Sequence, residues 1–140
     1  MKPELDSLLC ERYPKIFVNR HGDPKETLMC WGFECGDGWY NIINQLCANI
    51  QHHVDWAQEQ KEKYGCGAGC TQVVAVQIKE KFGTLRFYTN GGNDQTYGMI
   101  RMAESMSAVT CEECGAPGKM RGRSWIYTAC DAHAREQDEP

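Results

Sequence analysis

Apolar side chains recur every three or four residues through the middle of the chain, over residues 38–64. The stripe consists of Trp39, Ile43, Leu46, Ile50 and Ala57, with Ile42, Cys47 and Val54 beside it. This spacing matches the 3.6-residue turn of an α-helix and predicts one long amphipathic helix whose stripe faces the core. We expect Asp37 to cap its N-terminus and Gly65 to end it.

Two shorter segments also carry a helical pattern. Residues 3–13 share a leucine face, and Pro14 should end that helix because the residue before a proline avoids the helical region. Residues 96–110 form the second, with Thr96 as the expected cap. Its apolar stripe is Met99, Met102, Ala103, Met106 and Val109. We expect the stripe to pack in the core; the alternative is an adaptable binding groove, which methionine side chains suit.

Apolar and polar positions alternate with a period of two between residues 74 and 88, as in half-buried strands. The alternation sets Val74, Val76 and Ile78 opposite Ala75, Gln77 and Lys79, and sets Leu85 and Phe87 opposite Arg86 and Tyr88. Phe82-Gly83 between the two runs predicts a tight hairpin turn. A short strand is expected at 27–34.

These elements predict an α+β fold, with two main helices packed on a small antiparallel sheet and a metal-binding module at the C-terminal end. We assign residues 1–110 to the α+β core, 111–135 to the module and 136–140 to an acidic, frayed tail.

Composition narrows the class of protein. Of the 140 residues, 41% are hydrophobic and 24% charged, which is ordinary globular usage and excludes a disordered chain. A net charge of −4 argues mildly against nucleic-acid binders as a class. The longest apolar run, Val73–Val76, is far short of the ~20 residues that span a bilayer, and acidic residues stand where a signal peptide would be basic. We expect no membrane partner and a cytoplasmic location.

The strongest chemical signal lies in the last third of the chain, among nine cysteines in all. Cys111 and Cys114 form a C-x2-C pair, and Cys130 and His133 form a C-x2-H pair after fifteen intervening residues. Three thiolates and one imidazole are a tetrahedral donor set for Zn²⁺. Four protein ligands leave no open position, so the site should be structural rather than catalytic. A zinc-ribbon or treble-clef-like module is predicted.

The loop between the two pairs carries cations and an aromatic side chain, which are the usual ingredients of nucleic-acid contact. They are Lys119, Arg121, Arg123 and Trp125. The alternative is that the module only stabilises the fold or that it docks a protein. Residues 81–88 also loosely resemble the aromatic, basic strand of RNA-recognition domains, although core packing of Leu85 and Phe87 explains that run equally well.

The remaining cysteines allow weaker hypotheses. A second, all-cysteine zinc site would use Cys30, Cys35, Cys66 and Cys70. The alternative is that Cys30, like Cys47, is a small core residue and that the others are idle thiols. We expect Cys10 in the core. Cys35 precedes the long helix, whose dipole would lower the pKa of its thiol. No motif ties a base to it, so we expect no enzyme activity.

Four strings together resemble a group of uncharacterised proteins of tailed phages and prophages, over roughly residues 28–134. The first string is Cys35-Gly36-Asp37-Gly38-Trp39, and the last is Cys130-Asp131-Ala132-His133. The two strings between them start with Lys79-Glu80-Lys81-Phe82-Gly83 and Cys111-Glu112-Glu113-Cys114-Gly115. The resemblance implies a setting, the cytoplasm of an infected bacterium, and transfers no catalytic residue.

The leading hypothesis is therefore a non-enzymatic, zinc-stabilised protein that binds a host or phage protein, with anti-defence (anti-CRISPR-like) inhibition as one such role. The alternative is a nucleic-acid-binding regulator that uses the basic loop between the ligand pairs. The sequence leaves the oligomeric state open.

Overall fold

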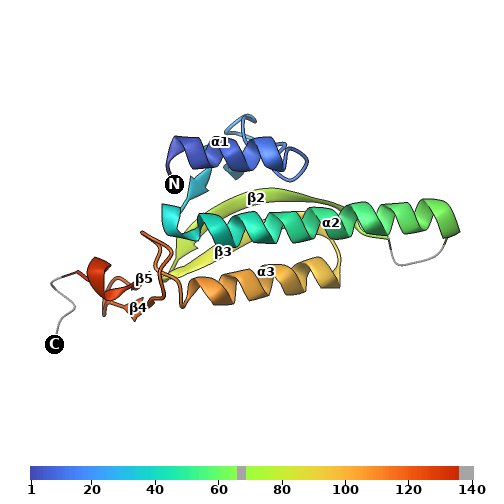
Figure 1. Cartoon of the computed structure of the whole chain (residues 1–140). Helices are drawn as coiled ribbons and strands as arrows, with labels where there is room; N and C mark the ends of the chain where they lie inside the picture. The colour runs from blue at the N-terminus through green and yellow to red at the C-terminus, as the bar shows by residue number, and fades with distance from the viewer. Residues whose placement is uncertain (66–68, 136–140) are drawn as a thin grey trace.

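The computed structural model describes residues 1–65 and 69–135 and has the predicted α+β architecture (Figure 1). Its α-helices are α1 (Pro3–Arg12), α2 (Tyr40–Tyr64) and α3 (Asp94–Ser107). Its strands are β1 (Phe33–Glu34), β2 (Thr71–Lys81), β3 (Thr84–Gly92), β4 (Lys119–Arg121) and β5 (Tyr127–Ala129). Short 3-10 helices are η1 (Leu28–Trp31), η2 (Asp37–Trp39) and η3 (Asp131–His133). Within the described ranges, no helix has the length and apolarity to cross a bilayer.

The predicted hairpin is present, and β2 and β3 pair antiparallel around a turn at Phe82 and Gly83. Strand β1 adds to β2 in parallel, so the three-stranded sheet is mixed and has the order β1-β2-β3. The short strand expected at 27–34 was only partly right. Most of it is η1, which begins where the Thr27 hydroxyl accepts a hydrogen bond from the Met29 amide.

The strict alternation expected along β2 is wrong. Val73 and Ala75 face the core upstream, Ile78 faces it downstream, and Val74 and Val76 are only partly buried. The pairing register shifts between Ala75 and Gln77, which lets the buried face resume at Ile78. A period-two pattern carries no information about such a bulge.

Helix α2 carries the predicted stripe into the core and ends as expected, at Gly65 with φ of 60°. The expected cap at its start is wrong. The Asp37 carboxylate accepts a hydrogen bond from the Lys2 amide at 2.7 Å, and Trp39 holds the N-cap position after η2. The short 3-10 turn separates Asp37 from the helix it was expected to cap.

Helix α3 begins earlier than predicted. Asn93 is its N-cap and accepts from the amides of Gln95 and Thr96, while the Thr96 hydroxyl accepts from the Asn93 amide in a capping box. Side chains of α3 also cover the free edge of β3, where the Leu85 amide donates to Ser107 Oγ at 2.8 Å. This arrangement leaves α2 and α3 side by side over the hairpin (Figure 1).

The expectation that the methionine stripe of α3 packs in the core is wrong. Ala103 is buried and Met99 is half-buried, but Met102 is 64% exposed and Met106 is 49% exposed. Val109 lies beyond the helix and is also exposed. Helix α3 buries Ile100, Ala103 and Ser107, and Ser107 bonds β3 at Leu85, so Met102 and Met106 lie on its outer flank.

Candidate metal centre and binding surfaces

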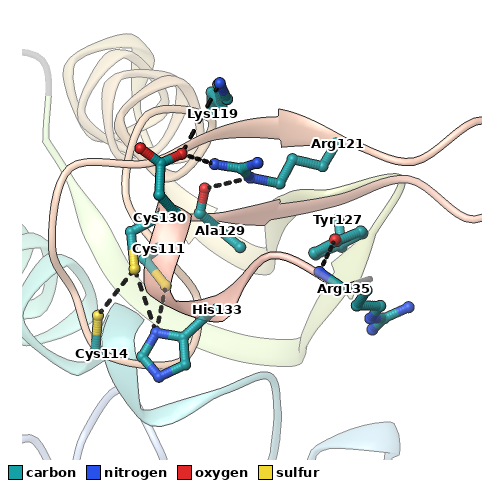
Figure 2. Close-up of polar contacts among 10 residues, drawn as sticks. Cys111, Cys114, Lys119, Arg121, Tyr127, Ala129, Cys130, His133 and Arg135 are labelled. Carbon is teal, nitrogen blue, oxygen red and sulfur yellow. Dashed lines mark hydrogen bonds and ion pairs between the residues drawn. The ribbon is translucent and has the colours of Figure 1, made fainter. Parts of the chain in front are cut away.

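The structure brings the four predicted metal ligands together at one end of the molecule (Figures 1 and 2). Cys111 and Cys114 come from the turn after α3, Cys130 ends β5, and His133 closes η3. Their ligand atoms all lie within 4.8 Å of one another. His133 turns its Nδ1 atom to the sulfurs, 3.6 Å from Cys111 Sγ and 3.3 Å from Cys130 Sγ. This cluster can hold a metal ion.

The backbone around Cys111 favours the thiolate form of its side chain, which is the form that binds a cation. Burial disfavours the thiolate, but backbone N–H groups of Cys130, Cys114 and Glu113 donate to the sulfur and lower the pKa of Cys111 to about 6. For Cys114, the Ala116 amide lowers the pKa, but burial and the neighbouring sulfurs raise it. One thiolate therefore forms readily, and the next requires positive charge beside it.

The glycine-rich segment at residues 36–38 packs against the turn that carries Cys111 and Cys114. The sequence alone assigned no role to these glycines. The Gly38 amide donates to Glu112 O at 2.7 Å, and the Gly36 amide donates to the Glu112 carboxylate at 2.9 Å. A Cβ on Gly38 would lie 2.2 Å from Cys111 O, so only glycine permits this approach. The signal in the sequence was the glycine spacing, but nothing local indicates the partner 74 residues away.

Two further contacts fasten the metal cluster to the rest of the chain. The Trp39 indole is fully buried and donates to Thr110 O at 2.9 Å, which joins the start of α2 to the segment before Cys111. The Thr128 hydroxyl donates to Gly83 O at 2.6 Å, which joins β5 to the hairpin turn. The cluster is thus held between the tip of the hairpin and the first turn of α2.

The basic loop divides into two parts. Arg121 Nε donates to Ala129 O at 3.0 Å, and its guanidinium also bonds the Asp131 carboxylate, which Lys119 approaches at 3.9 Å (Figure 2). Hydrogen bonding from Arg121 lowers the pKa of Asp131 below its ordinary value. The Arg121 side chain therefore braces β4 against β5 rather than facing solvent.

Arg123 and Trp125, by contrast, are exposed at the turn between β4 and β5. Trp125 lies against the hairpin turn, where residues of both segments line a cavity of about 510 Å³. The lining is Lys79, Glu80, Lys81, Phe82, Ser124, Trp125 and Ile126. The structure thus joins two runs that looked separate in the sequence.

A second cavity lies on the flank of α2 and α3, where a groove of about 530 Å³ separates the two helices. Ile42, Leu46 and Ala103 form its apolar floor, and the exposed methionines of α3 form one side. The opposite side carries the amides of Asn41, Gln45 and Asn49. No charged residue of the described chain lines this groove.

The structure contradicts the hypothesis of a second, all-cysteine zinc site. Cys35 follows β1, whose Glu34 pairs with Lys79, whereas Cys70 precedes β2 at its other end. Nine residue steps from Cys70 to Lys79, at about 3.3 Å each, place these thiols roughly 30 Å apart, too far to share an ion. Cys66 lies outside the described residues, and Cys30 is half-buried. Cys10 packs at the margin of the core, as expected.

Cys35 also lacks the electrostatics of a reactive thiol. Burial raises its pKa to about 12, although the chain's terminal ammonium opposes the shift. The expected lowering by the dipole of α2 is therefore wrong in direction, because desolvation outweighs it. At neutral pH the thiol is protonated.

No protein-family model, no curated protein and no solved structure was found to match this chain. The site itself therefore defines the class of protein: a small α+β chain with a three-cysteine, one-histidine cluster that can hold a metal ion.

Proposed function

We propose that this protein is a non-enzymatic, zinc-stabilised binding protein that docks an amphipathic helix of a partner protein between α2 and α3. The observation that carries the proposal is the apolar groove with Met102 and Met106 exposed along its side. Exposing two methionines to water forgoes burial free energy, which a partner's apolar face would recover.

Zinc is the metal that suits the cluster. Zn–S bonds of ~2.3 Å in a tetrahedron require sulfurs about 3.8 Å apart, and Zn–N bonds of ~2.0 Å require sulfur and nitrogen about 3.6 Å apart. Cys114 Sγ and Cys130 Sγ are 3.8 Å apart, and Cys111 Sγ lies 3.6 Å from His133 Nδ1. Four protein ligands occupy every tetrahedral position, which favours a structural role over catalysis.

A helix is the occupant that the groove dimensions favour. The walls run from Asn41 to Asn49 and from Gly98 to Met106. Eight residues at 1.5 Å rise make each wall about 12 Å long, the length of two helical turns. A partner helix would insert apolar anchors at positions i, i+3 or i+4, and i+7. Because no described charge lines the groove, its contacting face should be uncharged.

Methionine and glycine together give the groove its adaptability. Methionine is flexible and polarizable and fits side chains of several shapes. A Cβ built on Gly98 would have nothing within 4 Å, so this glycine leaves open space at one end of the α3 wall, which a larger side chain would occupy. The resemblance to tailed-phage proteins makes a host or phage protein the partner to seek, and defence complexes are the first to test.

The experiment begins with a photo-crosslinking residue at position 102, with position 18 as the control because Val18 is equally exposed outside the groove. The zinc-loaded chain is irradiated in nuclease-treated bacterial lysate, and the crosslinked peptide is mapped by mass spectrometry. A synthetic peptide of that segment is then titrated by calorimetry against the wild type, Gly98→Leu and Gly98→Ala.

We expect crosslinks from position 102 alone and a peptide that becomes helical when bound. Gly98→Leu should weaken binding at least tenfold because its side chain fills the groove, whereas Gly98→Ala should bind like the wild type. Equal binding by the two variants, equal crosslinking from position 18, or loss of the partner on nuclease treatment would overturn the proposal.

A further inference from the structure

The turn of the hairpin holds a bulky aromatic residue in a costly conformation. Phe82 has a φ of 53°, in the left-handed region that favours glycine, asparagine and aspartate. Its ring is also 66% exposed. Both features are unfavourable, and glycine at this position would avoid both. The position therefore points to a role for the ring outside the fold.

A second exposed aromatic lies across the same cavity. Trp125 is also 66% exposed, although it comes from the turn between β4 and β5. The two turns are fixed relative to each other, because Thr128 bonds Gly83 O and a Cβ on Gly83 would already touch Ile126 at 3.0 Å. Phe82 and Trp125 thus border a preformed cavity with Ile126 at its base.

The sheet face beside this cavity is basic. Ile78, Leu85 and Phe87 point into the core, so Lys79, Lys81 and Arg86 point to the opposite face. Lys79 and Arg86 are cross-strand partners, and Tyr88 lies further along β3 on the same face, exposed.

None of the three cations makes an ion pair across residues 1–65 and 69–135. Lys81 is exposed and lies over the Phe82 ring at 5.5 Å, whereas Arg86 is half-buried and its Nη1 donates to Leu85 O at 3.0 Å and to the Thr84 hydroxyl. Glu34 of β1 is the register partner of Lys79, and its carboxylate accepts a hydrogen bond from the Gln77 side chain. Glu80 lines the cavity, but its carboxylate is held by the Gly83 amide at 2.7 Å. A chain of net charge −4 thus gathers positive charge next to two exposed rings.

We propose that this surface, formed by the Phe82–Trp125 cavity and the Lys79–Arg86 sheet face, binds single-stranded nucleic acid. A base would stack against the two rings, and the phosphates on either side would meet the lysines and arginine. Stacking requires an unpaired base, so a duplex fits this cavity poorly. We therefore assign the phosphate contacts to Lys79, Lys81 and Arg86 rather than to Lys119 and Arg121. The Arg121 side chain already bonds Ala129 O and the Asp131 carboxylate.

The test uses fluorescence anisotropy with the zinc-loaded protein. The probes are fluorescein-labelled 12-nucleotide oligo-dT and oligo-U and a 12-base-pair duplex, each at 25 and 200 mM KCl. The variants are Phe82→Gly, Trp125→Ala and Lys81→Gln. Trp31→Ala is the matched control, because Trp31 is 63% exposed on η1 and does not line the cavity. Glycine suits the positive φ at position 82, so that variant removes the ring without disrupting the fold.

We expect single strands to bind more tightly than the duplex, with affinity that falls steeply with salt. Phe82→Gly and Trp125→Ala should each weaken binding about tenfold, Trp31→Ala should have no effect, and Lys81→Gln should lower the salt slope by about one. Absence of binding at 25 mM KCl, equal affinity for the duplex, or equal losses for Trp31→Ala and Trp125→Ala would overturn the proposal. Displacement of the oligonucleotide by an equimolar 12-residue polyglutamate would overturn it in favour of an acidic protein ligand.

Discussion

Single glycines determine whether distant segments can approach each other. Gly38 lies against the carbonyl of Cys111, where a Cβ would be 2.2 Å from the oxygen, whereas Gly98 faces open space within α3. The same residue type therefore stabilises the structure at one position and weakens it at the other. At Gly38 it permits contact between backbones, and at Gly98 it costs helix propensity.

This difference predicts opposite effects of the same substitution. Gly38→Ala should lower the free energy of unfolding by about 3 kcal/mol, because the turn that carries Cys111 and Cys114 must move away from η2. Gly98→Ala should raise it by about 0.5–1 kcal/mol, since alanine favours an exposed helix interior. Urea unfolding followed by circular dichroism measures both. Equal stability of Gly38→Ala and the wild type would contradict the packing of Gly38 against Cys111.

At the scale of elements, one arginine braces the segment from β4 to η3 beside the cysteine–histidine cluster. Arg121 reaches Ala129 O and Asp131, while Arg123, two residues away, is exposed and makes no bracing contact with any residue that the structure describes. The two arginines look alike in the sequence, and only the strand pairing distinguishes them.

We therefore predict that Arg121→Gln destabilises the β4–β5 segment by about 1 kcal/mol, the value of a typical hydrogen bond, and that Arg123→Gln has no measurable effect. Amide hydrogen exchange read at β4 and β5 should rise for the first variant only. Faster exchange in both variants would show that Arg121 is no more structural than Arg123.

Removal of the metal should act on the same elements. Cys114→Ser should abolish stoichiometric zinc in elemental analysis, whereas Cys30→Ser, a non-ligand, should retain one zinc per chain. Without metal, the sulfurs no longer share a cation, and the segment from 111 to 135 should lose order while the buried stripe of α2 stays protected. Hydrogen exchange of the Gly38 amide, which bonds Glu112 O, reports the loss directly. Retention of zinc by Cys114→Ser would reject the ligand set.

At the scale of the molecule, α2 and α3 lie together along one side of the hairpin (Figure 1), and Lys81 and Tyr88 on its other face are exposed. The methionine groove belongs to the helical side, and the basic aromatic surface belongs to the far side of the sheet and the hairpin tip. The two surfaces share no lining residue. The two proposed binding surfaces therefore do not overlap.

This layout predicts independent binding. Gly98→Leu should abolish capture of the partner peptide but leave oligonucleotide affinity unchanged, and Trp125→Ala should do the reverse. Titrating the peptide into the protein–oligonucleotide complex should give the same peptide affinity as for the free protein, within twofold. A large change in either cross-test would mean that the two surfaces are one site or are coupled.

Much of this protein follows from its sequence because the relevant patterns are local. The 3.6-residue period predicts α2, Gly65 predicts its end, and the two-residue spacing of Cys111 and Cys114 and of Cys130 and His133 identifies the cluster. Each of these features depends on residues within one or two turns of each other, where backbone geometry leaves few alternatives.

Only the tertiary structure decided which apolar residues are free and which distant segments meet. The methionines of α3 have a core-like spacing, but Ile100 and Ala103 are the residues that α3 buries, so Met102 and Met106 remain exposed. Phe82 and Trp125 lie 43 residues apart and meet because the Thr128 hydroxyl bonds the Gly83 carbonyl. Such contacts depend on how whole elements pack, and no local pattern in the sequence encodes them.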